Sequence, residues 1–440
     1  MRRKFQAALG AGTAFRSDRG GNFAVLTAAV ASMLAVTIGF GVNIAQLYNI
    51  KSGLRNALDS AVTSTARDLT TGKIDAKDAR TRFMAFLQSN ADPELSPSDR
   101  LVLDSLVVDQ NAKTVTATAH VDTDLFFPLF SSGPTQRVGE KSAALYSDKQ
   151  IEVAMMLDIT GSMAGQKIKD LKAAADDALD AFLTGQDPAK PRVRVAIVPY
   201  AEAVNTGSLS NTVFAETKFT TSEPPALDDP VGASTAPDKC ATERKGKQQF
   251  TDASPYTAMV NRDYRLGFCP SAALMPLSAD SAALKKTISK FSAGGSTSGH
   301  IGIQWSWYML SPKWADVLPK TSDPAAYNSK KVAKYAVLMT DGEFNTAFAG
   351  VPKGEATTNA QASRSRAYAE QLCDAMKKDG IEIFTVGFML KEAGAKEVLG
   401  DCASPDSGKV QHYFETSSGD ELKAAFLAVA QNIERLAITE

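Results

Sequence analysis

The stretch that decides the fold is Ile151–Ser162, which reads IEVAMMLDITGS. Its first seven residues form a short apolar run, as expected of a strand that is buried on both faces. A carboxylate and two hydroxyls then follow at alternate positions, Asp158, Thr160 and Ser162. A strand-to-helix turn of this kind can direct three oxygens at one point, and open parallel sheets bind ligands at the carboxyl ends of their strands. The stretch therefore predicts an α/β sheet with oxygen ligands at one edge.

Beyond this stretch, strand and helix patterns alternate to the end of the chain. We expect strands at 193–198, 336–339 and 381–388, and helices at 168–182, 284–291, 299–311, 362–378 and 422–436. Such alternation predicts a doubly wound, mostly parallel, Rossmann-like sheet over residues 150–440, with helices on both faces. Residues 201–280 contain seven prolines and little periodicity, so a long irregular insertion is expected there.

Two further oxygen-bearing residues fall where the same sheet edge is expected. Thr297 follows a Gly-Gly-Ser turn before a helix, and Asp341 directly follows a buried strand. Carboxylate and hydroxyl oxygens suit a hard divalent cation, with Mg²⁺ first and Mn²⁺ or Ca²⁺ as alternatives. The expected ligands are therefore Asp158, Thr160, Ser162, Thr297 and Asp341.

These five residues resemble the metal-ion-dependent adhesion site of von Willebrand factor type A domains. That family's Asp-x-Ser-x-Ser, Thr and Asp match the five positions in order, with Thr160 in place of the first serine. The resemblance implies that the cation keeps an open position for an acidic side chain of a partner protein. It implies recognition and not an enzyme, and no histidine base stands near Ser162 in the sequence.

The N-terminal part contains an apolar segment of membrane-spanning length. From Phe23 to Val42 the only polar side chains are three hydroxyls, and twenty helical residues cover about 30 Å. Five Lys or Arg against Asp18 give +4 before this segment, so residues 1–22 are expected in the cytoplasm and the rest beyond the membrane. A cleaved signal peptide and a buried soluble helix are the alternatives. A helical, amphipathic extension is expected to about residue 69.

A small strand-rich domain is expected over residues 70–149. Residues 70–98 have a polar helical pattern that ends at two prolines. Leu101–Val108 and Thr114–Val121 alternate apolar and polar side chains on either side of a short polar turn, which predicts a β-hairpin. The composition of this domain indicates no chemistry.

The chain has four cysteines, Cys240, Cys269, Cys373 and Cys402, which allow three pairings. An oxidising compartment outside the cytoplasm would permit disulfides. A Cys240–Cys269 bond would hold the insertion together, and a Cys373–Cys402 bond would join a helix to the loop after the next strand. Buried free thiols are the alternative.

Overall charge argues against nucleic acid as a partner. Lys and Arg total 48 and Asp and Glu 49, so the net charge is −1 and no strong positive field surrounds the 440 residues. The basic cluster at 244–247 is interpreted as facing solvent, and Trp305 as part of the core of an amphipathic helix. No phosphate-binding loop of the Gly-x4-Gly-Lys-Ser/Thr type is present in the sequence.

Loose motifs along nearly the whole chain resemble TadG-like proteins of Flp (tight adherence) pilus systems. They are Ala57–Ala61, Ile151–Met163, Cys240–Arg244, Cys269-Pro270, Trp305–Trp307, Leu310–Pro312, Cys373 and Cys402. The resemblance implies a single-pass protein of the bacterial inner membrane with a periplasmic body, and pilus or secretion-apparatus subunits as partners. The alternatives are a surface-displayed adhesin, a metal-assisted hydrolase, and a structural subunit whose metal site is unused. Gly20-Gly21 resembles a prepilin peptidase site, but Leu26 replaces the expected Glu and argues against cleavage.

Overall fold

The computed structural model describes residues 20–90, 100–128, 133, 135–186, 190–214, 239–263, 266–327, 331–350 and 361–439. The expected cytoplasmic residues 1–19 and the prolines at 224–237 lie outside these ranges. The chain divides into two compact units, Met1–Ala66 with Lys77–Leu145, and Arg67–Ala76 with Tyr146–Glu440. Each unit has a main sheet of its own.

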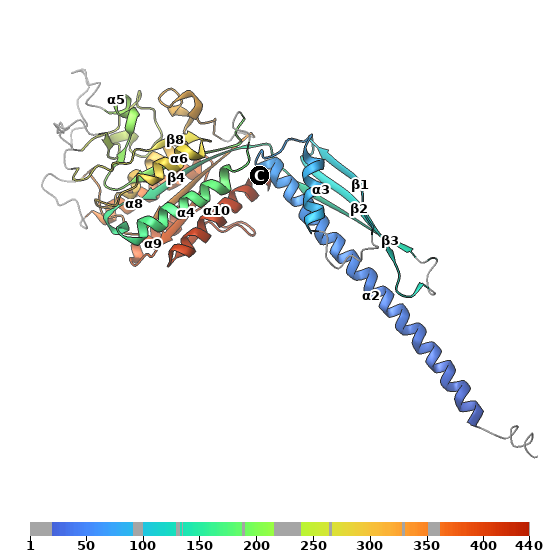
Figure 1. Cartoon of the computed structure of the whole chain (residues 1–440). Helices are drawn as coiled ribbons and strands as arrows, with labels where there is room; N and C mark the ends of the chain where they lie inside the picture. Colours follow the sequence, from blue (N-terminus) through green and yellow to red (C-terminus); the bar gives the residue numbers. More distant parts are fainter. Residues whose placement is uncertain are drawn as a thin grey trace, which may run out of the picture. The chain divides into compact units, whose positions relative to one another are not determined.

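The first unit is built on one long helix, α2 (Gly20–Thr70), drawn in blue in Figure 1. From Val25 to Val42 its large apolar side chains are exposed, and Met33 is 74% exposed and Phe40 54%. Among the described residues, this is the one helix that is long and apolar enough to cross a membrane, in the place where the sequence predicts such a segment. Gly53 does not interrupt the helix.

The C-terminal part of α2 has the predicted amphipathic character, because Leu54, Leu58 and Val62 are buried. Beside it lie α3 (Ala79–Asn90) and an antiparallel sheet in the order β1-β2-β3 (Figure 1). The strands are β1 (Arg100–Asp109), β2 (Thr114–Asp124) and β3 (Thr135–Leu145). The predicted hairpin is β1-β2, and alternate residues of β2 are buried: Val115, Ala117, Ala119 and Val121.

The second unit contains a six-stranded sheet in the order β11-β10-β9-β4-β5-β8. Its strands are β4 (Gln150–Asp158), β5 (Val193–Tyr200), β8 (Met275–Ser278), β9 (Val332–Thr340), β10 (Ile381–Phe388) and β11 (Tyr413–Thr416). All neighbours pair in parallel except β8, which runs antiparallel to β5. The predicted doubly wound, mostly parallel α/β sheet is therefore confirmed.

Helices cover both faces of this sheet, and alternate side chains of β4 enter two separate cores. Val153, Met155 and Leu157 pack with α4 (Gln166–Leu183), α6 (Ser281–Ser289) and α10 (Gly419–Thr439). Figure 1 shows α4 and α10 side by side on this face. Ala154 and Met156 pack with α7 (Gly299–Leu310) and α8 (Ala362–Lys378) on the opposite face. A further helix that the sequence patterns do not reveal, α9 (Ala393–Cys402), packs on α8 and β10.

In its described residues, the insertion expected at 201–280 contains only short helices and strands. It holds β6 (Val204–Asn205) paired with β7 (Cys240–Ala241), the short helix α5 (Ser210–Val213), and, at its end, the sheet strand β8. Pro276 fits β8 because an edge strand tolerates the missing N–H. Both disulfides that the sequence favours are present, Cys240–Cys269 and Cys373–Cys402.

One expectation for the insertion is wrong. Arg244, which the sequence places in a solvent-facing basic cluster, is completely buried. Its guanidinium lies 5.0 Å from the ring centre of Tyr308 and 5.9 Å from that of Trp314. Cation–π contacts and the aliphatic stem explain why this arginine enters the core. Trp305 is buried as predicted.

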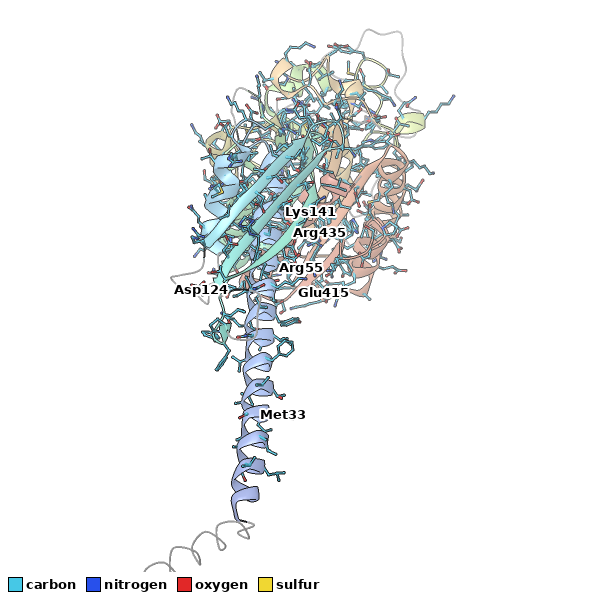
Figure 2. All side chains as sticks on the ribbon, turned by 90° about the vertical axis from the view of Figure 1, so that its right-hand side faces the viewer. Met33, Arg55, Asp124, Lys141, Glu415 and Arg435 are labelled. Carbon is cyan, nitrogen blue, oxygen red and sulfur yellow. A yellow bond between two sulfur atoms is a disulfide. The ribbon has the colours of Figure 1, made fainter. Side chains whose placement is uncertain are left out.

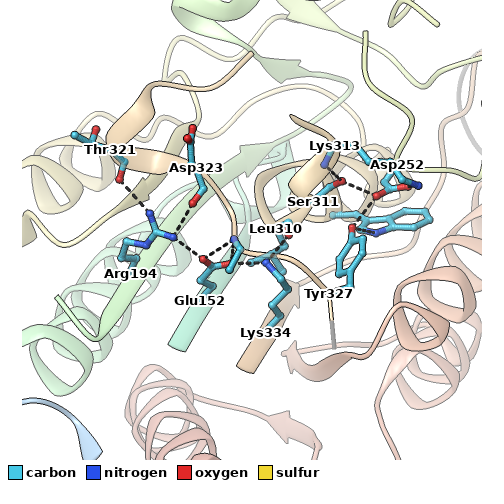
Figure 3. A network of polar contacts seen from close by, with 12 residues as sticks. Glu152, Arg194, Asp252, Leu310, Ser311, Lys313, Thr321, Asp323, Tyr327 and Lys334 are labelled. Atoms are coloured by element: carbon cyan, nitrogen blue, oxygen red, sulfur yellow. Dashed lines mark hydrogen bonds and ion pairs between the residues drawn. The ribbon is translucent and has the colours of Figure 1, made fainter. Parts of the chain in front are cut away.

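A buried ion cluster lies near the N-terminal ends of the central strands (Figure 3). Glu152 of β4 lies in register with Arg194 of β5 and Lys334 of β9, and its carboxylate binds both side chains at 2.5 Å. Burial lowers the pKa of Lys334, while the charge of Glu152 acts against that shift. Three charged side chains thus belong to the core at this end, and the opposite end carries the candidate site.

Candidate metal centre

The predicted ligands lie where the strand order of the sheet reverses. β4 ends at Asp158 and its neighbour β9 ends at Thr340, directly before Asp341. The chain adds β5 on one side of β4 and later β9 on the other. The crevice outside the carboxyl ends of such neighbouring strands is the usual ligand-binding position in this class of fold.

Asp158 is fully buried and accepts hydrogen bonds on both carboxylate oxygens. Oδ1 accepts from the backbone N–H of Thr160 at 2.9 Å and from its hydroxyl at 2.6 Å. Oδ2 accepts from the hydroxyls of Tyr200 at 2.9 Å and Thr340 at 2.7 Å. Burial and the nearby charge of Asp341 raise the pKa of Asp158 to about 6. Hydrogen bonds therefore hold both oxygens of the carboxylate, and burial makes its negative charge costly without a cation.

A chain of hydroxyl contacts links the two carboxylates. The hydroxyl oxygens of Thr160 and Ser162 are 2.9 Å apart, and Ser162 donates to Oδ1 of Asp341 at 2.5 Å. The other oxygen of Asp341 accepts from Lys167 at 2.7 Å. Ser162 is exposed whereas Asp158 and Asp341 are buried, so the cluster meets solvent at Ser162.

The Thr297 hydroxyl reaches the same place from another loop. The backbone N–H of Gly161 donates to the carbonyl of Gly295 at 2.9 Å, which joins the two loops. A Cβ on Gly342 would stand 3.5 Å from Oγ of Ser162 and 4.0 Å from Oγ1 of Thr297. Both hydroxyls therefore converge beside Gly342, and all five predicted residues gather at one point of the sheet edge.

Several supporting residues escaped the sequence analysis. Lys167, Tyr200 and Thr340 contact the two aspartates directly. Asn345 accepts from the backbone N–H of Thr297 at 2.9 Å and donates its own N–H to the carbonyl of Thr297 at 2.9 Å. Only Thr340 carried a signal, because it precedes Asp341 at the end of the same strand. The others come from different elements, and their approach depends on the tertiary fold.

Glu202, also absent from the prediction, ties the insertion to the Thr297 loop. Its carboxylate accepts from the backbone N–H groups of Gly267 at 2.9 Å, Phe268 at 3.1 Å and Ser296 at 3.0 Å. The ring of Phe268 lies so close to Gly295 that a Cβ there would approach it to 2.6 Å. Gly295 also has a φ of 75°, a conformation that favours glycine. The insertion therefore supports the loop that presents Thr297.

The donor set fits a hard divalent cation. Two buried carboxylates face one ammonium group, that of Lys167, so an uncompensated negative charge is left. Within the described residues no group of three or more His, Cys, Asp or Glu side chains is placed to hold a metal, so a cation here would need the hydroxyls as ligands. Oxygen ligands with water in the remaining positions suit Mg²⁺ and related ions.

Within the part of the chain that the structure describes, the same geometry places no histidine base beside Ser162. Its described hydrogen bonds join it to Thr160 and Asp341. His300 instead lies 2.8 Å from the hydroxyl of Ser365, and His412 lies 2.7 Å from Glu382. Ser162 donates its hydrogen bond to a buried carboxylate and lies beside another hydroxyl oxygen, an arrangement that fits an oxygen ligand of a hard cation.

No family profile and no curated protein matches the chain. Among solved structures, it is similar to the vWF domain of the type V pili tip protein Mfa5 from Porphyromonas gingivalis, with 14% identity over 66% of this chain and 97% of that one, TM-score 0.40. It is also similar to the pilus adhesin SpaC from Lactobacillus rhamnosus GG, with 12% identity over 78% of this chain, TM-score 0.39. The chain spans about a third of SpaC, 35% of its length.

A third similar structure is the mussel byssus proximal thread matrix protein 1 with a zinc-occupied MIDAS motif. The identity is 15% over 66% of this chain and 46% of that one, with a TM-score of 0.32. Because every one of these TM-scores lies below 0.5, the function of the present chain has to be argued from its own residues.

Proposed function

We propose that this protein is a membrane-anchored, non-enzymatic binding component of a bacterial pilus or secretion apparatus. Its α/β unit binds a divalent cation, with Mg²⁺ preferred, through Asp158, Thr160, Ser162, Thr297 and Asp341. An acidic side chain of a partner protein completes the coordination of that cation. The observation that carries this proposal is the continuous series of oxygens from Asp158 to Asp341, which opens to solvent at Ser162.

The position of the opening supports recognition of another protein. The two carboxylates are buried and held by hydrogen bonds, so they can supply negative charge to a cation without moving. Ser162 is at the surface, so a cation bound beside it would have its open position toward solvent. A carboxylate from a partner neutralises the cation more completely than water does, which makes an acidic residue the preferred occupant.

The anchor is the second part of the proposal. The large apolar side chains of α2 from Val25 to Val42 are exposed, which is costly in water and favourable in a bilayer. Both disulfides agree with a body that folds in an oxidising compartment. We therefore place the N-terminus in the cytoplasm and the body in the periplasm, with pilus or secretion-apparatus subunits as partners.

Metal titration of the full-length protein in lipid nanodiscs tests the cation site. Calorimetry with Mg²⁺ and Mn²⁺ is expected to show one site in the wild type and none in Asp158→Asn or Thr297→Val. Asparagine is preferred to alanine, because Asp158 accepts five hydrogen bonds that alanine would leave unmade. Asp374→Asn, a 65% exposed carboxylate on α8, is the control and is expected to bind like the wild type. Equal affinity in all four proteins would refute the site.

Location is tested on intact cells. A periplasmic body is protected from added protease until the outer membrane is opened, whereas a surface-displayed adhesin is digested at once. Crosslinking of native membranes with and without EDTA then asks whether partner capture needs the cation. Capture that is unchanged by EDTA and by Asp158→Asn would leave a structural role without use of the metal.

A further inference from the structure

The loop that follows β2 exposes two aromatic side chains. Phe126 is 69% exposed and Phe127 42%, whereas the preceding Leu125 is buried. No charged residue occurs between Leu125 and Pro128. Two neighbouring exposed phenylalanines are unfavourable in water, so they indicate a surface that binds another apolar partner. The surroundings of the loop indicate which partner that is.

Two amide side chains of α2 hold this loop in place. Asn43 donates to the carbonyl of Phe127 at 2.8 Å and accepts from its backbone N–H at 3.0 Å. Gln46 donates to the carbonyl of Asp124 at 2.9 Å and accepts from the N–H of Phe126 at 3.2 Å. Figure 2 shows Asp124 beside α2, at the end of the sheet that lies toward the N-terminal, apolar part of the helix. The loop thus has a defined height along the helix.

That height coincides with the end of the apolar segment. Val42 is the last residue of the uncharged apolar run, and Asn43, the next residue, is the first to bind the loop. At about 1.5 Å per residue, Gln46 lies only about 5 Å farther along the axis. If the apolar segment crosses the bilayer, as proposed above, Phe126 and Phe127 lie at the level of its outer interface.

Backbone polar groups of this loop are hydrogen-bonded, as a partly apolar environment requires. Backbone N–H and C=O groups are costly to bring out of water unless they are hydrogen-bonded. Asn43 and Gln46 bind four of these groups, the N–H groups of Phe126 and Phe127 and the carbonyls of Asp124 and Phe127. The helix adds Tyr48, 72% exposed, at a neighbouring level. Aromatic side chains at this level are typical of membrane–water interfaces.

We propose that Phe126 and Phe127 form a second membrane contact, which inserts into the interfacial layer of the same bilayer that α2 crosses. The occupant of this surface is the lipid bilayer itself. The contact would set the first unit directly on the membrane, with β1–β3 standing over the lipid surface beside α2. This inference rests on the proposed anchor.

Spin labelling of the full-length protein in liposomes tests the contact. Single cysteines replace Phe126, Met33 or Ala112 in turn and carry a nitroxide, and collision rates with oxygen and with a water-soluble nickel complex are compared. Met33 lies in the apolar segment and is 74% exposed, so it reports the anchor alone. Ala112 is exposed in the turn at the other end of β2, about 35 Å away for eleven residues of strand, and reports water.

The expected ratio of oxygen to nickel collisions is several-fold higher at positions 33 and 126 than at position 112. A high ratio at position 33 with equal low ratios at 126 and 112 would overturn the second contact and leave the anchor standing. Low ratios at all three positions would overturn the anchor, and the contact with it. A label at 126 that is immobilised but reached by nickel would indicate that protein, and not lipid, covers the two phenylalanines, and would also overturn the proposal.

Discussion

The side-chain nitrogen of Lys167 lies 2.7 Å from Oδ2 of Asp341, the carboxylate that follows β9. The carboxylate of Asp341 has no exposed surface, while the lysine side chain is 25% exposed at the start of α4. The ammonium group thus neutralises part of the charge that a divalent cation would use. Because Lys167 is flexible and reaches solvent, it can leave when a cation arrives, but it then gives up this ion pair.

Removal of Lys167 is therefore expected to strengthen cation binding. A partly buried ion pair of this kind contributes about 1 kcal/mol, so Lys167→Ala is expected to lower the Kd for Mg²⁺ roughly fivefold. Calorimetry on the full-length protein measures the change. Lys169→Ala removes an exposed lysine of the same helix and controls for net charge. Equal gains in both variants would indicate a general effect of charge and would contradict direct competition by Lys167.

The ion cluster at the other end of the sheet is expected to govern stability without touching the metal centre. Glu152→Gln removes the charge that Arg194 and Lys334 share, and these side chains are only 16% and 3% exposed. Loss of one member of a buried cluster costs about 3–5 kcal/mol. Urea unfolding followed by tryptophan fluorescence reports this unit, because all three tryptophans of the chain lie in it.

The control for this experiment is Asp180→Asn, which breaks an ion pair with Lys285 in which the aspartate is 54% exposed. Its cost is expected to stay below about 1 kcal/mol. Mg²⁺ affinity should be the same in both variants and the wild type. A loss of affinity in Glu152→Gln would show that the two ends of the sheet are coupled.

Close packing between the start of α7 and the loop that follows β9 leads to a third expectation. A Cβ on Gly299 would come within 1.4 Å of the ring of Phe344, which is fully buried. In the sequence, Phe344 lies between Asp341 and Asn345. Gly299→Ala must displace this ring, and overpacking of this kind costs about 1–3 kcal/mol. Since the same loop carries Asp341, Mg²⁺ affinity should fall together with the urea midpoint. Gly400→Ala on α9, where a Cβ meets nothing within 4 Å, should leave both unchanged or raise stability slightly.

Local pattern was sufficient for much of the fold. The apolar run at Ile151–Leu157 and the 3.6-residue spacing within 168–182 predict β4 and α4 closely, because a buried strand is a short apolar run and an amphipathic helix has a characteristic period. β8 and β11 escaped prediction, because each has only four residues and exists through pairing at a sheet edge. A strand that short has no period to detect.

For the candidate site, the sequence predicts the residues of the metal-binding motif but not the surrounding residues that position them. Asp158, Thr160 and Ser162 are recognisable because one turn carries them all. Lys167 and Glu202 lack such a signal, since any surface lysine or glutamate looks the same in a sequence. Arg244 differs in the opposite way, because its basic run predicts a solvated side chain and the structure packs that side chain on aromatic rings.

The last expectation concerns the Cys240–Cys269 disulfide and the metal loop. Cys269 directly follows Phe268, whose ring packs on Gly294 and Gly295 and whose backbone binds Glu202. Without the disulfide, this segment is less restrained in the folded protein, and the loop that carries Thr297 loses part of its support. Replacing both cysteines by serine is therefore expected to weaken Mg²⁺ binding severalfold and to lower the melting temperature.

The second disulfide provides the matched control. Cys373–Cys402 joins α8 to the end of α9, has the same sequence separation of 29 residues, and has no described contact with the site. Serine at both of its positions should lower the melting temperature by a similar loop-closure effect while the Kd for Mg²⁺ stays at the wild-type value. If both double variants lose affinity equally, global destabilisation explains the result, and the insertion has no specific role in positioning Thr297.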